Sequence, residues 1–210
     1  MYRRQVTLAK DMFLKKQNHN NLGFFLCIMV IVFLYSKNLF SYETSEDIQD
    51  YINNIDNFTS KFVQTDNNSI EEGRLYIKNN IIRLDYDSPK RTIKINDKKG
   101  VYIDHSLREE EFFSTKKGLI KIFYDIFLNT NYFKDSEFKK SKNQIVFSKI
   151  VSQEDLKIKV YVIFEIMPLV LRKVITKSED INLTLGFSEH EYNATFEKDF
   201  FSFVPIYLDN

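Results

Sequence analysis

LKIKVYVIF, at residues 156–164, alternates apolar and polar side chains, and its five apolar side chains fall on one face. Alternation with a period of two is typical of a β-strand with one buried face. The same period recurs in residues 74–78, 92–96 and 181–187, and turn-forming pairs such as Asn-Asn at residues 79–80 separate the runs. Short strands separated by turns predict an antiparallel sheet or barrel. Strands do not alternate with helices along the chain, so a parallel sheet is not favoured.

A helix is predicted just before the first strand. Thr44 and Asp47 fit a capping box. Apolar side chains then recur at helical spacing, at Ile48, Tyr51, Ile52 and Ile55. The other face is polar, so we expect this helix to lie on a hydrophobic surface.

A second helix is predicted where the period of two breaks, in TKKGLIKIFYDIFL at residues 115–128. One face carries Leu119, Ile122, Phe123, Ile126 and Phe127, and Ile120 and Tyr124 widen that face beyond an ordinary apolar stripe. Two interpretations follow: a plain core helix across one mouth of the barrel, or a lid whose apolar excess meets a ligand. Periodicity does not separate the two.

The N-terminus has the pattern of an export signal. Residues 22–35 form an uncharged apolar run that is short for a membrane-spanning helix, and the flank before it is basic. Ser41 supplies a small residue after the run. We predict a secretory signal peptide at residues 1–41, starting at Met1 or Met12, followed by one domain at residues 42–210. The alternative is an uncleaved membrane anchor.

The balance of charged residues argues against two classes of partner. Of 30 Lys and Arg residues six lie in residues 1–41, and of 29 Asp and Glu residues one does, so residues 42–210 carry 24 basic and 28 acidic side chains and a net charge of about −4. This balance does not favour nucleic acid or a polybasic membrane patch as a partner. The single cysteine lies within the predicted signal peptide, so we expect neither a disulfide nor thiol chemistry in the domain.

The chain offers little for catalysis. Only His105 and His190 lie outside residues 1–41, and neither has the second histidine of a zinc motif. His190, in a polar stretch, is predicted to be a solvated loop or strand end. Asp85, Asp87 and Asp104 are carboxylates at predicted strand ends, as any β protein has. We therefore predict no enzyme activity, no metal and no cofactor.

Five short motifs follow one another in an order that resembles a known family. They are FTSKFVQ at residues 58–64, GRLYIK at 73–78, LDYDSP at 84–89, DKKGVYID at 97–104 and NATFEKDFFSFVP at 193–205. They are similar to the F-x-x-x-F-x-Q, G-x-L-x-ϕ-K-R-P, F-R-W/Y-x-x-P, D-G-x-x-x-x-x-D and closing F-x-F-x-x-P elements of the LolA family. The resemblance spans roughly residues 46–206.

The resemblance implies a periplasmic chaperone that shuttles lipoproteins from the inner to the outer membrane. Its implied fold is mainly β with α: an unclosed, strongly curved antiparallel β barrel, with helices covering an apolar cavity for lipoprotein acyl chains. The implied partners are lipoproteins, an inner-membrane ATP-driven lipoprotein-releasing complex, and an outer-membrane receptor or the outer membrane itself. We expect a monomer. A periplasmic carrier or sensor of another amphiphile, such as a glycolipid, stays open on the same fold.

The acyl cavity is predicted from strand alternation. The inward-facing strand residues should be Phe62, Leu75, Ile77, Ile82, Leu84, Tyr86, Ile93 and Ile95. The helix residues Leu119, Ile122, Phe123 and Ile126 should face them. A single bulge would invert some of these assignments, and the alternative is that the same residues form an ordinary filled core.

The chain departs from the family at the lid latch. The family has Arg-Pro after the lysine matched by Lys78, and that arginine bonds backbone carbonyls of the lid helix, whereas this chain has Asn79 and Asn80. An amide makes weaker hydrogen bonds than a guanidinium. Either Arg83 supplies the latch, or it is a surface arginine and the lid is held by packing. We expect the latter, because Arg83 alternates with inward-facing Ile82 and Leu84.

Overall fold

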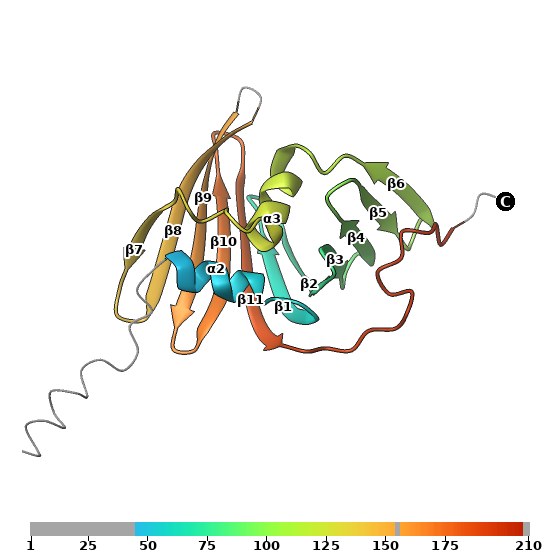
Figure 1. The fold of residues 1–210 in the computed structure, drawn as a ribbon. Coiled ribbons are helices and arrows are strands. Elements are labelled where there is room, and N and C mark those ends of the chain that lie inside the picture. The colour runs from blue at the N-terminus through green and yellow to red at the C-terminus, as the bar shows by residue number, and fades with distance from the viewer. Residues whose placement is uncertain (1–44, 154–155, 208–210) are drawn as a thin grey trace, which may run out of the picture. The chain divides into compact units, whose positions relative to one another are not determined.

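The computed structural model describes residues 45–153 and 156–207, which form two helices and one sheet (Figure 1). The helices are α2 (Ser45–Asn53) and α3 (Gly118–Leu128). The strands before α3 are β1 (Phe58–Thr65), β2 (Ile70–Lys78), β3 (Ile81–Tyr86), β4 (Arg91–Ile95), β5 (Gly100–Asp104) and β6 (Glu109–Phe113). Those after it are β7 (Glu137–Lys140), β8 (Gln144–Gln153), β9 (Leu156–Ile166), β10 (Leu169–Lys177) and β11 (Asn182–Glu191).

All 11 strands belong to one antiparallel sheet, in the order β6-β5-β4-β3-β2-β1-β11-β10-β9-β8-β7. Pairing of β1 with β11 joins the two hairpin series, with Phe62 opposite Phe187. The sheet curls without closing, because β6 and β7 lie at its two ends (Figure 1). The predicted mainly β fold, an unclosed and curved antiparallel sheet with helices, is confirmed.

The turn between β2 and β3 illustrates how the sequence dictates this hairpin. Asn79 and Asn80 both have positive φ, 50° and 60°. Positive φ at both residues of a two-residue turn matches the right-handed twist of paired strands, and asparagine tolerates that conformation better than other residues with a side chain. Lys78 therefore pairs directly with Ile81, and the inward alternation of β2 continues in β3.

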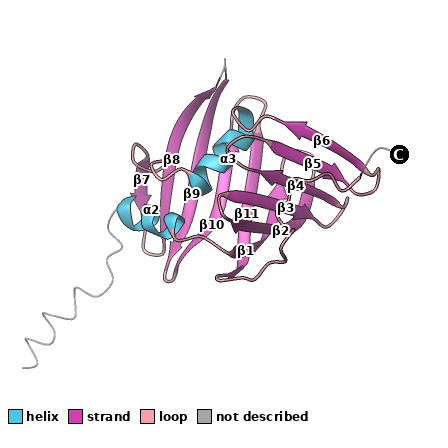
Figure 2. Ribbon diagram, turned by 45° about the vertical axis from the view of Figure 1, so that its right-hand side comes forward, coloured by secondary structure: helices cyan, strands magenta, loops and turns pink. Residues whose placement is uncertain are grey.

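Both helices lie on the concave face of the sheet (Figure 2). The apolar stripe of α2 is buried, with Ile48 0% and Ile52 2% exposed, and the Tyr51 ring meets Phe164 of β9 edge-on at 5.8 Å. Helix α2 ends at Asn53, so Ile55 follows the helix and does not extend its stripe, although its side chain is also buried.

The predicted signal peptide and its alternative, a membrane anchor, fall on residues 1–41, outside the described residues, and so does Thr44 of the capping box. Within the described residues, no helix has both the length and the apolar character needed to cross a bilayer. The boundary at residue 41 stays a prediction.

We predict that Gly73→Ala destabilises the domain while Gly186→Ala is tolerated. A Cβ at Gly73 would lie 2.2 Å from the Asp85 carbonyl oxygen and 2.7 Å from the Phe62 ring, whereas at Gly186 the nearest atom is 3.9 Å away. Overpacking of this kind lowers the free energy of unfolding by about 1–3 kcal/mol. Urea unfolding of both variants checks this; equal midpoints for the two would contradict the close approach of Phe62 to β2.

Candidate functional site

The concave face of β1–β4 is apolar along most of its length, and the cross-strand register brings the predicted cavity residues together. Leu75 pairs with Leu84, and Ile82 pairs with Ile95. The buried members of the set are Phe62, Leu75, Ile77, Ile82, Leu84, Tyr86, Ile95, Ile122, Phe123 and Ile126. Ile93 and Leu119 are half-buried. Whether these residues bind a ligand stays a prediction.

Helix α3 covers the part of the concave face formed by β10 and β11. Its buried side chains are Ile122, Phe123, Ile126 and Phe127, and the Phe127 ring meets Phe187 of β11 edge-on at 6.0 Å. The cavity between α3 and these strands is about 20 Å³, lined by apolar side chains such as Val174 and Leu185. That volume holds little more than one water, so the space between α3 and these two strands is filled.

Helix α3 has weak ends. Its N-cap residue, Lys117, makes no side-chain capping hydrogen bond, the first turn has no acidic residue and the last turn no basic one. Side-chain caps and complementary charges at helix ends each contribute about 0.3–2 kcal/mol, and α3 lacks a side-chain cap at Lys117 and complementary charges in its end turns. At its C-terminal end the backbone N–H of Asn129 donates to the Asp125 carbonyl. Apolar packing on the sheet is therefore the main force that holds this helix.

The first latch candidate, Asn79, lies beside the C-terminal end of α3. Asn79 and Asn80 line a cleft of about 300 Å³ together with Ile55, Phe127 and Leu128. The backbone N–H of Asn79 donates to Asp56 Oδ1 at 3.1 Å. This hydrogen bond fastens the turn after β2 to the segment after α2. Among the described residues, it joins Asn79 to Asp56 and not to α3.

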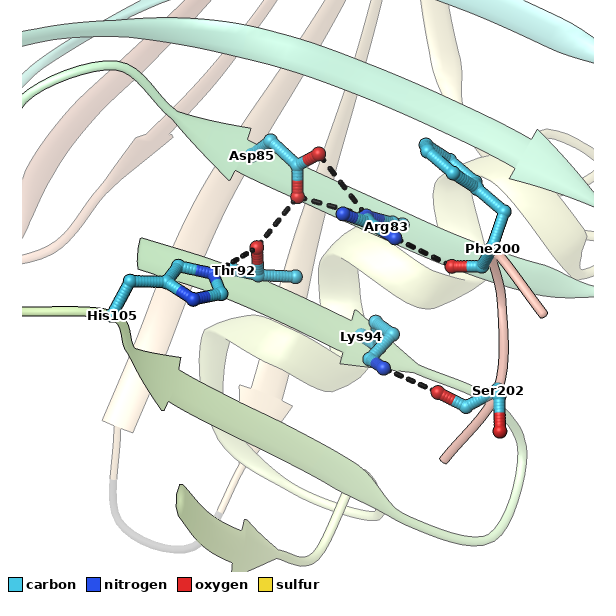
Figure 3. A network of polar contacts seen from close by, with 7 residues as sticks. All are labelled: Arg83, Asp85, Thr92, Lys94, His105, Phe200 and Ser202. Carbon is cyan, nitrogen blue, oxygen red and sulfur yellow. Dashed lines mark hydrogen bonds and ion pairs between the residues drawn. The ribbon is translucent and has the colours of Figure 1, made fainter. Parts of the chain in front are cut away.

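The second latch candidate, Arg83, lies on the convex face, as its alternation with Ile82 and Leu84 predicts. Its Nε donates to Asp85 at 2.8 Å, its Nη1 donates to the Phe200 carbonyl, and its guanidinium lies 3.9 Å from the centre of the Phe200 ring (Figure 3). Arg83 is only 19% exposed, so it is not a plain surface arginine. These contacts fasten the C-terminal segment, residues 192–207, and a latch role for Arg83 stays a prediction.

Polar side chains of β3–β5 form the network that holds the C-terminal segment. Lys94 donates to the Ser202 carbonyl (Figure 3). His105 contacts the Tyr207 hydroxyl at 3.0 Å. Lys94 is 3% exposed, and burial together with the charge of Arg83 lowers its pKa. A carbonyl of the segment is thus the hydrogen-bond acceptor for a buried cation, which gives the segment a defined course.

The same network contains Asp85, Thr92 and His105, three residue types that also occur in hydrolase sites. The Thr92 hydroxyl donates to Asp85 at 2.7 Å, and His105 Nε2 lies 3.0 Å from that hydroxyl. A nucleophile would have to pass its proton to the histidine, and here the proton points to the carboxylate. Thr92 is 3% exposed, which indicates a structural role for the group. Among the described residues, no three His, Cys, Asp or Glu side chains are grouped to hold a metal.

His190 differs from its prediction as a solvated residue. It lies near the end of β11, half-buried, with its ring stacked 5.5 Å from Phe58. Burial and the positive charge of Arg172 lower the pKa of His190. Alternation did not show this because Phe58 of β1 and Arg172 of β10 are distant from His190 in sequence.

Sequence reasoning missed a polar group on the concave face. Glu71 and Arg91 form an ion pair there, with Gln64 and Tyr86 beside it. Gln64 was visible as the last residue of the first family-like motif, but nothing local relates Glu71 to a residue 20 positions later. The register of β2, β3 and β4 brings them together.

We predict that the protein loses stability as the pH falls from about 6.5, in part through His190. A folded-state pKa below the unfolded value of about 6.5 means that the unfolded chain takes up the proton first. His190→Gln should therefore flatten the loss of unfolding free energy between pH 7.5 and 5.5. A slope unchanged in His190→Gln would contradict the burial of this imidazole.

We predict that Arg83→Leu lowers the free energy of unfolding by about 1.5–3 kcal/mol, because it removes a charged hydrogen bond and an ion pair that are partly shielded from water. Faster proteolysis within residues 192–207 should accompany the loss. Chemical denaturation and limited proteolysis measure both effects. Unchanged stability together with defective lipoprotein transfer would instead support a latch role for Arg83.

Neither a protein family model nor a curated protein matches the chain. Among solved structures, an uncharacterized conserved protein from Thermus thermophilus is similar at 8% identity and a TM-score of 0.46, over 73% of this chain and 90% of that one. A Pseudomonas aeruginosa MucA/MucB complex gives 11% identity and 0.43, over 73% and 59%. MucB in complex with MucA(peri) gives 11% and 0.37, over 73% and 56%. These similarities are too distant to assign the chain to a family.

Proposed function

We propose that the protein is a periplasmic carrier that binds the acyl chains of lipoproteins on its concave face and shuttles lipoproteins from the inner to the outer membrane. The observation that carries the proposal is the contact between an apolar helix with weak ends and the apolar concave face of an unclosed sheet. The motif resemblance supports the same function, and the predicted signal peptide supports the compartment.

The energies of loading and release are compatible with a shuttle. One acyl chain of about 15 methylenes gains roughly 12 kcal/mol if it is fully shielded from water. The four buried side chains of α3 are together worth about 6–12 kcal/mol on the same scale. An acyl chain that takes the place of α3 on the sheet therefore exchanges one apolar contact for another. The net free energy is small, so cargo can enter and leave.

Release to a membrane is also favoured by charge. Residues 42–210 carry a net charge of about −4, which disfavours long residence at anionic membrane surfaces. An ATP-driven releasing complex at the inner membrane and a receptor, or the outer membrane itself, would act before and after this carrier.

The test is native mass spectrometry of protein purified from the periplasm after co-expression with a lipoprotein. We expect a complex with the triacylated cargo, and a cargo whose lipidated cysteine is replaced by alanine should not be retained. A free lipid in place of the lipoprotein would favour a carrier of another amphiphile. Protein recovered empty in the presence of abundant triacylated cargo would contradict the proposal.

A further inference from the structure

Four polar side chains gather at one rim of the otherwise apolar concave face. Gln64 lies near the end of β1, Glu71 near the start of β2, Tyr86 at the end of β3 and Arg91 at the start of β4. Because these strands are antiparallel, the four positions meet at the same end of the sheet. Gln64 pairs with Glu71, and Tyr86 pairs with Arg91, so all four share the face of Leu75 and Leu84.

The four side chains bond to one another in a fixed arrangement. Arg91 Nη2 donates to Glu71 Oε2, which also accepts from Gln64 Nε2 at 3.1 Å. The Tyr86 hydroxyl donates to Gln64 Oε1 at 2.9 Å, and the Arg91 guanidinium lies 4.1 Å from the centre of the Tyr86 ring. We call these four residues the rim cluster.

The rim cluster is poorly explained as a stabilising device. Glu71 is 15% and Arg91 19% exposed, so both charges are largely removed from water. Replacement of such a pair by apolar side chains of similar volume is often neutral or stabilising. Arg91 Nε is moreover buried without a hydrogen-bond partner among the described residues. An unused donor beside an apolar face suits a ligand that brings its own acceptor.

We infer that the rim cluster binds the uncharged ester and amide groups where the acyl chains of the cargo join its polar part. This inference rests on the proposed carrier function. The Glu71 carboxylate neutralises Arg91, so a second anion, such as a phosphate, would meet a neutral site with a carboxylate at its centre. Carbonyl oxygens instead accept from Arg91 and from the Gln64 amide without adding charge.

The position of the cluster also gives the cargo a direction. From Glu71 to Ile77 the concave positions of β2 run along about 20 Å of strand, and past Glu71 they are occupied by Gly73, Leu75 and Ile77. Acyl chains that start at the rim cluster would therefore lie along Leu75 and Ile77 towards the turn at Asn79. The polar part of the cargo would stay at the rim, in water.

The test compares two competitors for a hydrophobic dye bound to the whole mature protein: a synthetic triacylated cysteinyl peptide of uncharged sequence, and dipalmitoyl phosphatidylglycerol. We expect the double variant Glu71→Met with Arg91→Met to keep dye binding and to lose about tenfold or more in affinity for the peptide, the effect of one charged hydrogen bond. The matched control is Glu165→Met with Arg172→Met, which removes a cross-strand ion pair that lies away from the cluster, between β9 and β10.

A second variant separates recognition from folding. Glu71→Gln keeps the shape but leaves Arg91 with an unpaired charge, so the preference should shift from the uncharged peptide towards phosphatidylglycerol. Equal peptide affinity in wild type and the double variant, or an unchanged preference in Glu71→Gln, would overturn the inference while leaving the carrier function intact. If the wild-type protein binds the dye but not the peptide, both the inference and the proposed function fail.

Discussion

The contact of the Phe62 ring with the backbone of Gly73 is the constraint on which the two halves of the sheet depend. Phe62 lies on β1, which pairs with β2 on one side and with β11 on the other, opposite Gly73 and Phe187 respectively. With no Cβ at Gly73, the ring can approach β2 closely and still meet Tyr86 edge-on at 5.0 Å. The apolar row therefore continues across the joint from β11 to β3, beyond the part of the face, formed by β10 and β11, that α3 covers.

Different forces hold the elements that pack on the two faces of the sheet. This difference determines which of these elements can leave the sheet. On the convex face, charged side chains bind carbonyls of the C-terminal segment, and Arg83 and Lys94 are both largely shielded from water. On the concave face, α3 is held by non-directional apolar contacts and has weak ends. Apolar contacts can be exchanged for an acyl chain at little net free energy, whereas a buried cation that loses its carbonyl cannot be compensated so simply.

Local pattern identified several strands and their faces, but not strands β6 to β8 and not partners that are distant in the chain. Alternation identified the inward side of β2, β3 and β9, and the asparagine pair identified the hairpin turn, because both depend on neighbouring residues. Pairing of β1 with β11, the bond from Arg83 to Phe200 and the ion pair of Glu71 with Arg91 depend on strand order and register, which no short window contains. His190 was assigned to solvent for the same reason.

The central claim is that α3 is held on the concave face mainly by apolar packing and leaves it when an acyl chain enters. Hydrogen–deuterium exchange of the α3 amides, with and without a triacylated cysteinyl peptide, tests that claim most directly. The account predicts that exchange in residues 118–128 becomes faster when the peptide is bound, while the strand amides of β9 stay protected. Unchanged or slower exchange in α3, in protein shown to hold the peptide, would contradict it.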